Sequence, residues 1–466
     1  MNSVNNVVIN FNSFLWGYVL IVLLIFTGLL FSFKTKFVQF KYIKEMFRLL
    51  GDGFGKSDKE KGGVSSFQAF CISTASRVGT GNIAGVAIAV SIGGPGAVFW
   101  MWIIALIGSA SSFVESTLAQ IYKIKDNDTF RGGPAYYMEK GLGKRWLGIL
   151  FSILITICFG FVFNAVQANT VSIAFHSAFG FSRLSIGIIL AIITALVIFG
   201  GIHRVAKVSE IIVPILAVAY ILIAIVVLLL NITEIPSVLK LIVESAFGMN
   251  QLVAGGLGAA VMQGIKRGLF SNEAGMGSAP NAAATATVSH PVKQGLIQTL
   301  GVFTDTLLIC SCTAFIVLLS GSYIGTNLTG IELTQKALVS QIGPFGAYFI
   351  AICILLFAFS SIVGNFYYGQ TNIEFINSKK WILNVYRIIV IGMVLFGSVT
   401  EVALVWNLAD LFMGLMAILN IISILFLGKY AFLALKDYTD QKKAGIKEPV
   451  FKAKNIPGLE NVEEWQ

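Results

Sequence analysis

Long apolar stretches, separated by short polar connections, dominate the pattern of this chain. A membrane-spanning helix needs roughly 20 predominantly apolar residues in a row. The pattern predicts eleven such helices, so the fold class expected is an all-α integral membrane protein. The predicted spans lie near residues 14–33, 66–92, 95–122, 147–176, 182–200, 209–231, 250–288, 294–320, 345–370, 381–399 and 402–428.

Two of these stretches are interrupted by short polar segments that are rich in glycine. Residues 76–82 read Ser-Arg-Val-Gly-Thr-Gly-Asn, and residues 271–278 read Ser-Asn-Glu-Ala-Gly-Met-Gly-Ser. Backbone that leaves a helix at membrane depth is tolerated only where it is buried in protein or lines a cavity. Paired broken helices in two halves of a chain indicate the midplane binding site of a secondary transporter.

The two interruptions also divide the chain into related halves. Ten spans follow the first one, and each group of five opens with a broken helix, so an odd number of crossings inverts the second group. The predicted organisation is an N-terminal helix with a cytoplasmic amphipathic loop, a first five-helix repeat, an inverted second repeat and a basic cytoplasmic tail. These parts are residues 1–65, 66–231, 250–428 and 429–466.

Composition and charge support a membrane protein and orient it. Hydrophobic residues make up 56% of the chain, charged residues 12%, and the mean hydropathy is +0.82. Basic residues in short connections mark the cytoplasmic side, and here one alternate set of connections holds nearly all of them, whereas the other holds Arg183, Lys240 and Lys336. We therefore expect a multi-pass protein of the plasma (inner) membrane with its N-terminus outside. The net charge of +10 then reflects orientation in the lipid bilayer, with no nucleic-acid partner.

Four motifs, spread over nearly the whole chain, carry a family resemblance. They are Val-Gly-Thr-Gly-Asn-Ile-Ala-Gly-Val-Ala from Val78, Gly-Gly-Pro-Gly-Ala-Val-Phe-Trp-Met-Trp from Gly93, Arg-Gly-Gly-Pro-Ala-Tyr-Tyr from Arg131, and Ser-Asn-Glu-Ala-Gly-Met-Gly-Ser-Ala-Pro from Ser271. In these motifs the chain resembles the alanine or glycine:cation symporters, also called amino acid carrier proteins, which have the leucine-transporter fold. The resemblance implies a transporter, not an enzyme, that carries small neutral amino acids with sodium by alternating access.

The resemblance also implies which residues hold the amino acid. Amides around Thr80 and Gly81 would bind its carboxylate, carbonyls of Phe270 and Ser271 would accept its ammonium group, and Met276 would line the pocket. Gln167 would bond the carboxylate, although an interhelical bond to Asn164 or Asn169 is the alternative. Substrate-site residues expected on this basis are Ser76, Thr80, Gly81, Gln167, Phe270, Ser271, Met276, Gly277 and Asn365.

A sodium ion is the expected co-transported ligand, and no organic cofactor is expected. The fold-level match suggests carbonyls of Ala75 and Val78 with hydroxyls of Ser360 and Ser361 as sodium ligands. The two serines could instead bond to carbonyls of their own helix. A site of neutral oxygens favours sodium over a proton, because proton coupling requires a titratable group.

Charged residues at membrane depth are functional candidates because burying them is expensive. Arg77 and Glu273 are gating candidates that could pair with one another, with pairing of Arg77 to backbone carbonyls as the alternative. Lys266 and Arg267 are read as paired gating charges. Glu115, Asp305 and Asp410 are interpreted as internal helix ties or cavity-facing polar groups.

Asn365 affects the predicted substrate size, because family members associated with alanine and glycine often have tryptophan there. The smaller asparagine predicts that serine or glutamine is admitted as well. A proton-coupled symporter and a nucleobase or organic-cation transporter on the same fold remain alternatives, whereas a channel or a membrane enzyme fits the pattern poorly. A monomer is expected.

Overall fold

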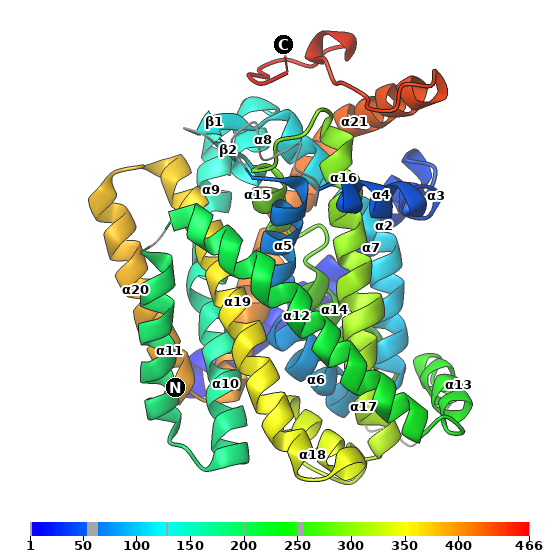
Figure 1. Ribbon diagram of the computed structural model, residues 1–466, viewed down its shortest axis with the longest axis vertical. Helices are drawn as coiled ribbons and strands as arrows, with labels where there is room; N and C mark the ends of the chain where they lie inside the picture. The colour runs from blue at the N-terminus through cyan, green and yellow to red at the C-terminus, as the bar shows by residue number, and fades with distance from the viewer. Residues whose placement is uncertain (1, 54–63, 127–128, 200, 250–255, 466) are drawn as a thin grey trace.

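The computed structural model describes residues 2–53, 64–126, 129–199, 201–249 and 256–465, which form an almost entirely helical molecule (Figure 1). Within these residues, seven helices are long and apolar enough to cross a membrane, or up to nine if each of two bent pairs counts as one span. The predicted count of eleven is therefore not confirmed. Two predicted spans correspond to shorter helices, α11 (Arg183–Ile198) and α14 (Gly256–Asn272), and residues 250–255 lie outside the described residues.

The chain begins with one long span and a short amphipathic helix. Helix α1 (Asn2–Phe14), the π-helical segment η1 (Leu15–Leu20) and α2 (Ile21–Lys34) follow one another directly. After them come α3 (Val38–Lys41) and α4 (Ile43–Asp52). Helix α4 buries Met46 and Leu49, whereas Phe47 and Lys44 are exposed, as expected for a helix at the edge of a bundle. The amphipathic loop predicted within residues 1–65 thus contains a helix, while residues 54–63 lie outside the described residues.

Both predicted interruptions are breaks in helices. Helix α5 (Ser66–Arg77) ends at the first interruption, and η3 (Gly81–Gly85) with α6 (Val86–Gly93) continues at an angle of 48°. A reciprocal capping box between Ser65 and Gln68 fixes the start of α5. Helix α14 ends at the second interruption and the short α15 (Ala279–Ala283) follows it.

The remaining elements complete the bundle and pack closely around the two breaks. Helices α14 and α16 lie against α7, and α19 lies against α5 and α10. Before the second break the helices are α7 (Gly96–Ile121), α8 (Pro134–Lys140), α9 (Arg145–Ile155), η4 (Thr156–Phe163), α10 (Asn164–Phe179), α12 (Gly201–Leu230) and α13 (Ile235–Ala246). After it they are α16 (Pro291–Val302), η5 (Phe303–Cys310), α17 (Ser311–Ser320), α18 (Gly330–Ile342), α19 (Phe345–Ile376), α20 (Lys380–Val399), α21 (Val402–Lys443) and the 3-10 turn η6 (Ala453–Asn455).

A small β-hairpin departs from the all-α expectation. Strands β1 (Ile124–Asp126) and β2 (Thr129–Arg131) pair antiparallel, with Ile124 opposite Arg131. They occupy the connection between α7 and α8, where a polar loop folds back on itself outside the apolar spans.

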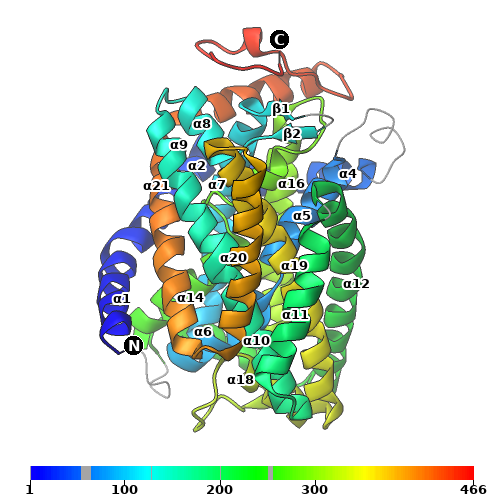
Figure 2. The same ribbon diagram turned by 90° about the vertical axis from the view of Figure 1, so that its left-hand side faces the viewer.

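The two ends of the molecule are built differently. Both views place α4, the hairpin, α8 and the segment after α21 at one end, which we call the tail end, and α18 at the other, which we call the opposite end (Figures 1 and 2). The breaks lie between the two ends. Helix α19 approaches α5 closely at Gly364, where an added Cβ would lie 3.1 Å from the backbone nitrogen of Ser76.

Candidate functional site

At the first break, polar side chains take the place of the missing helical hydrogen bonds. Val78 is extended, with φ of −80° and ψ of 94°, so α5 ends there. The next amides then bond to side chains: Gly79 N donates to Asn82 Oδ1 at 2.9 Å, and Thr80 N donates to Gln167 Oε1 at 3.1 Å. Unwound backbone at this depth is therefore satisfied within the protein, as burial requires.

At the second break, three residues adopt left-handed backbone conformations. Glu273, Gly275 and Gly277 have φ of 58°, 82° and 85°. The carboxylate of Glu115 accepts from the amides of Gly275 and Gly277 at 3.0 and 3.1 Å, and from Asn420 Nδ2 at 2.8 Å. A carboxylate that takes two amides in this way makes strong, charge-assisted bonds. Glu115 is thus an internal tie between helices, one of the two roles that the sequence suggested, and it fixes the unwound backbone of the second break.

Ser76 and Asn365 join the two breaks to the long helix α19. Ser76 Oγ lies 2.7 Å from Glu273 Oε1 and 2.8 Å from Asn365 Oδ1, and Ser278 Oγ donates to Glu273 Oε2 at 2.5 Å. Because a serine hydroxyl carries one proton, Ser76 can donate to only one of its two neighbours at a time. Asn365 Nδ2 reaches Asn164 Oδ1 at 3.2 Å, so α10 belongs to the same network.

Asp305 forms a second connection between the breaks. Its Oδ1 accepts from Asn82 Nδ2 at 2.7 Å, and its Oδ2 accepts from Ser271 Oγ at 2.7 Å and from Thr306 Oγ1 at 2.9 Å. The residue is fully buried, and Ser271 also lies 3.1 Å from Cys310 Sγ. A negatively charged group in η5 is thereby held against both broken helices by neutral donors.

Aromatic and apolar side chains enclose the site on the remaining sides. The ring of Phe270 lies 4.5 Å from that of Phe163 and 4.8 Å from that of Trp406, measured between centroids. A Cβ at Gly81 would come within 2.9 Å of the Phe270 ring, so the first break approaches this wall closely. Met276 is buried next to the second break.

The predicted sodium ligands are only partly brought together. Ser361 Oγ lies 3.3 Å from the carbonyl of Val78 and 3.1 Å from the carbonyl of Phe357, so it spans from α19 to the first break. Ser360 Oγ donates to the carbonyl of Phe357 at 2.8 Å, which is the bond within its own helix that the alternative described. Ala75 is buried in the last turn of α5.

Arg77 and Glu273 do not form an ion pair in the part of the chain that the structure describes. Arg77 Nη1 donates to the carbonyl of Gln298 on α16 at 3.3 Å, and its Nε and Nη2 are buried without a hydrogen-bond partner. Glu273 turns toward Ser76 and Ser278 instead. Of the two hypotheses, the structure therefore shows Arg77 bonded to a backbone carbonyl, which belongs to α16.

Three charged side chains form a buried cluster on the side of the second break that faces the opposite end of the molecule. Lys266 Nζ and Arg267 Nη2 both contact Asp410 Oδ2, at 2.8 and 2.7 Å. Arg267 also lies over the Trp406 ring at 4.7 Å, and Lys266 lies over the Trp16 ring at 5.6 Å. The expected pairing of Lys266 and Arg267 is thus with Asp410, and it ties α14 to α21.

Sequence reasoning did not assign Asn82 to the site and gave Asp305 only a general polar role. Asn82 ends the first interrupted motif, so its place in that motif was the available signal. Nothing local places Asp305 beside it, because the two residues are 223 positions apart in the chain.

Comparisons with known proteins place the chain among amino-acid carriers. A model of the sodium:alanine symporter family matches residues 1–453. The probable sodium/glutamine symporter GlnT of Bacillus subtilis (strain 168) is 60% identical over 454 residues, covering 97% of this chain and 94% of that protein. Amino-acid carrier protein AlsT of the same organism is 57% identical, covering 100% and 99%. Sodium/alanine symporter AgcS of Methanococcus maripaludis is 39% identical, covering 93% and 96%.

Two solved structures share the fold at low sequence identity. The crystal structure of MhsT in complex with L-phenylalanine has a TM-score of 0.52 and 16% identity, covering 81% of this chain and 99% of that one. An Eremococcus coleocola manganese transporter mutant also has a TM-score of 0.52, at 14% identity, covering 85% and 82%. The expectation of a leucine-transporter-like fold is confirmed.

Proposed function

The chain belongs to the sodium:alanine symporter family, and we propose that it couples uptake of a small neutral amino acid to sodium by alternating access. It is a multi-pass membrane transporter and not an enzyme. The single observation that carries the proposal is the meeting of two buried helix breaks through Ser76, Glu273 and Asn365. Such paired breaks are where transporters of this fold type hold an amino acid and its ion.

The amino-acid carboxylate is proposed to bind at the first break. Helix ends there present amide groups, with the positive end of the following helix behind them. The Thr80 amide is held by Gln167, so carboxylate binding would exchange that internal bond for one to the substrate. Gly81 has no side chain to obstruct the approach.

The amino group is proposed to bind near the carbonyls of Phe270 and Ser271. Asp305 supports this proposal, because its buried carboxylate lies against Ser271 and makes that region electrostatically favourable for a cation. Met276 and Gly277 would line the remaining side. The substrate thus bridges the two breaks, and its binding stabilises the closed arrangement.

Sodium is proposed to bind between Ala75, Val78, Ser360 and Ser361. The approach of Ser361 to the Val78 carbonyl supports it, since sodium requires several oxygen ligands from both elements. One sodium moving down about 100 mV releases roughly 2.3 kcal/mol. A tenfold sodium gradient adds about 1.4 kcal/mol. The two contributions together suffice to accumulate the amino acid roughly several hundredfold.

Alanine and glycine are the main substrates proposed. Serine and glutamine are proposed as further substrates, because Asn365 leaves space for a longer side chain. Support for glutamine comes from the relative with 60% identity, which is named as a probable sodium/glutamine symporter. A relative with 44% identity is named as a putative sodium/proton-dependent alanine carrier, so proton coupling is tested alongside sodium.

The proposed orientation puts the tail end in the cytoplasm. The basic residues of the α4 region, the α7–α8 connection and the segment after α21 support it, by the positive-inside rule. We further propose that residues 66–231 and 250–428 are the two inverted repeats, because each begins with a broken helix.

Uptake into proteoliposomes tests the function. Labelled alanine and glutamine should accumulate with an inward sodium gradient and should not accumulate when potassium replaces sodium, whether or not a proton gradient is present. Ser361→Ala should raise the sodium concentration for half-maximal uptake about tenfold, because one ligand is lost. Ser340→Ala is the matched control, since that hydroxyl donates to the carbonyl of Ala337 in its own helix. Equilibration without accumulation under every gradient would contradict symport.

A further inference from the structure

Residues 444–465, which follow α21, fold across the tail end of the molecule (Figures 1 and 2). We call them the tail strap. The segment contains a single short turn of helix, η6, yet it makes a long series of contacts with separate elements. Two groups of contacts, one near its beginning and one near residue 465, hold it to the bundle, and Tyr430 Oη donates to the carbonyl of Gly458 between them.

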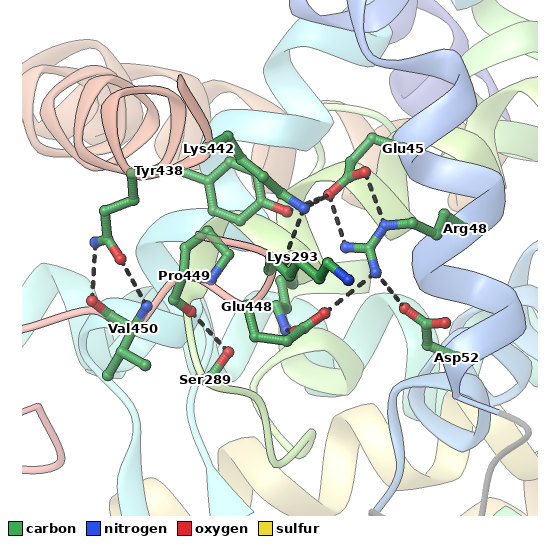
Figure 3. Close-up of polar contacts among 12 residues, drawn as sticks. Glu45, Arg48, Asp52, Ser289, Lys293, Tyr438, Lys442, Glu448, Pro449 and Val450 are labelled. Carbon is green, nitrogen blue, oxygen red and sulfur yellow. Dashed lines mark hydrogen bonds and ion pairs between the residues drawn. The ribbon is translucent and has the colours of Figure 1, made fainter. Parts of the chain in front are cut away.

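The first anchor is an ionic network between the strap, α4 and the start of α16 (Figure 3). Glu448 accepts from Arg48 Nη1 at 3.2 Å and forms an ion pair with Lys293. Ser289 Oγ donates to the carbonyl of Pro449 at 2.8 Å. The beginning of the strap is therefore bound to α4 and to the start of α16, two helices that also pack against each other.

The beginning of the tail strap is also hydrogen-bonded to the end of α21, through residues 447 and 450. Gln441 Nε2 donates to the carbonyl of Val450 at 2.9 Å, and Val450 N donates to Gln441 Oε1 at 2.9 Å. Lys442 Nζ donates to the carbonyl of Lys447 at 2.8 Å. These paired bonds make the chain turn back sharply over the helix bundle.

The second anchor is aromatic and centres on Trp465. Its indole Nε1 donates to the carbonyl of Gln120 at the end of α7 at 2.8 Å. Lys123 Nζ lies 4.8 Å from the Trp465 ring and 3.9 Å from the Phe130 ring, which places the cation between two aromatic faces. The ring of Phe451 packs edge-on against that of Trp465 at 5.5 Å.

This second anchor continues into the two broken helices. Lys123 Nζ and Gln120 Nε2 both donate to the carbonyl of Ala286, each at 3.0 Å. Ala286 follows α15 and pairs in a β-bridge with Val64, whose carbonyl accepts from Thr287 N at 3.0 Å. Val64 precedes the N-cap of α5. A chain of contacts thus runs from Trp465 to the start of the first broken helix and the segment after the second.

We propose that the tail strap restrains opening of the tail end by holding α5 and the segment after α15 together through Trp465, Gln120 and Lys123. The inference rests on the proposed function, because alternating access requires this end to open. Opening would separate Val64 from Ala286, so the strap has to loosen in each transport cycle. Weakening the strap shifts the population toward the form that is open at the tail end.

Cys71 supplies a native reporter for this opening. It lies within α5 and is 1% exposed, so a maleimide reaches it only when α5 moves away from the bundle. Trp465→Ala should raise the rate of Cys71 modification about tenfold in the full chain, because a buried hydrogen bond and a cation–π contact are lost. The rate is measured by peptide mass spectrometry on reconstituted protein, and Trp465→Phe, which keeps a ring, should restore part of the protection.

Two controls separate strap release from general loosening. Trp381→Ala removes an exposed tryptophan of α20 and should leave Cys71 modification unchanged. Cys158, buried in η4 within the same protein, should remain protected in every variant. Equal Cys71 rates in Trp465→Ala and Trp381→Ala would overturn the proposal.

A second variant covers the case in which Trp465→Ala fails to fold. Glu448→Gln changes a half-exposed side chain and removes the ionic anchor, so increased Cys71 modification supports the restraint and an unchanged rate overturns it. Sodium-driven uptake of the amino acid is measured separately. If the parent shows no sodium-driven uptake, the proposed function fails, whereas the Cys71 rates still report whether the strap restrains α5.

Discussion

The side-chain amide of Asn365 contacts two other elements of the site. Its Oδ1 lies 2.8 Å from Ser76 Oγ on α5, and its Nδ2 lies 3.2 Å from Asn164 Oδ1 on α10. Ser76 has one proton for Asn365 and Glu273, and a carboxylate is the stronger acceptor. When that proton faces Glu273, Asn365 Oδ1 is available to a polar substrate group. A buried amide with spare hydrogen-bonding capacity favours a substrate such as glutamine over an apolar one.

Replacing Asn365 by tryptophan tests this explanation of substrate size. Asn365→Trp should lower the ratio of glutamine to alanine uptake about tenfold, because the ring fills space that the longer substrate requires. Competitive uptake of the two labelled amino acids measures the ratio.

Asn365→Ala separates volume from hydrogen bonding, since it removes the amide and leaves the space. It should retain glutamine uptake better than Asn365→Trp does. A tryptophan variant that carries glutamine as well as the parent would refute the size argument.

At the scale of elements, charged side chains hold the broken helices in place. Glu115 on α7 takes two amides of the second break, and Asp410 on α21 takes both Lys266 and Arg267 of α14. Buried charges are tolerated only when they are paired and hydrogen-bonded. The unwound segment between α14 and α15 therefore keeps its shape because helices on two sides supply the partners that its own backbone lacks.

Removing the charge of Asp410 should destabilise the protein strongly. Asp410→Asn keeps the size of the side chain and leaves two buried cations without a counter-charge, which typically costs about 3–5 kcal/mol. We expect a melting temperature several degrees lower in detergent, measured by a thermal-shift assay.

Glu139→Gln provides the comparison for this change. Its partner Arg145 is 53% exposed, so the loss should be within about 1 kcal/mol. If Asp410→Asn and Glu139→Gln melted together, the buried cluster would contribute nothing to the stability of α14.

At the scale of the whole molecule, each end has its own network of contacts. The Lys266–Arg267–Asp410 cluster lies toward the opposite end. The tail strap lies at the tail end, as do the ion pairs of Arg48 with Glu45, Asp52 and Glu448, which we call the α4 network. A transporter that alternates between two openings must weaken these networks in turn. The ion pairs of Arg48 at the tail end are more exposed than the buried cluster, so they should respond to pH and salt more readily.

The α4 network makes stability depend on pH through Glu45. Hydrogen bonds from Arg48, and further bonds from Tyr438 and Lys442, lower the pKa of this carboxyl from 4.5 to about 2. Because the pKa is lower in the folded protein, the stabilisation is complete above about pH 4.5 and is lost as the pH falls toward 2. The difference in melting temperature between the parent and Glu45→Gln should therefore be constant near neutral pH and shrink below pH 4.5.

Asp52→Asn is the matched control, because Asp52 also pairs with Arg48 and is 56% exposed. It should change the melting temperature little at any pH. A Glu45→Gln difference that persists unchanged to the lowest pH would show that the charge of Glu45 is not what stabilises the network.

Local pattern in the chain was sufficient for the class of protein, the order of the apolar stretches and the position of both breaks. Apolar runs and glycine clusters act on neighbouring residues, so they can be read along the chain. The family resemblance, and not local pattern, implied that Gln167 bonds the substrate carboxylate, and in the structure its side chain accepts from Thr80 N at the first break. The hairpin between α7 and α8 was missed, because three-residue strands carry too short a pattern to identify.

Partners of buried charges and the course of the tail were settled by packing. Glu115 meets Asn420 across 305 positions, and Trp465 meets Gln120 across 345. Arg77 could have reached several acceptors, and it bonds to Gln298 because α16 passes beside the end of α5. Charge and polarity limit which groups can pair. The helices that bring two distant groups within hydrogen-bonding distance are arranged by close side-chain packing throughout the bundle.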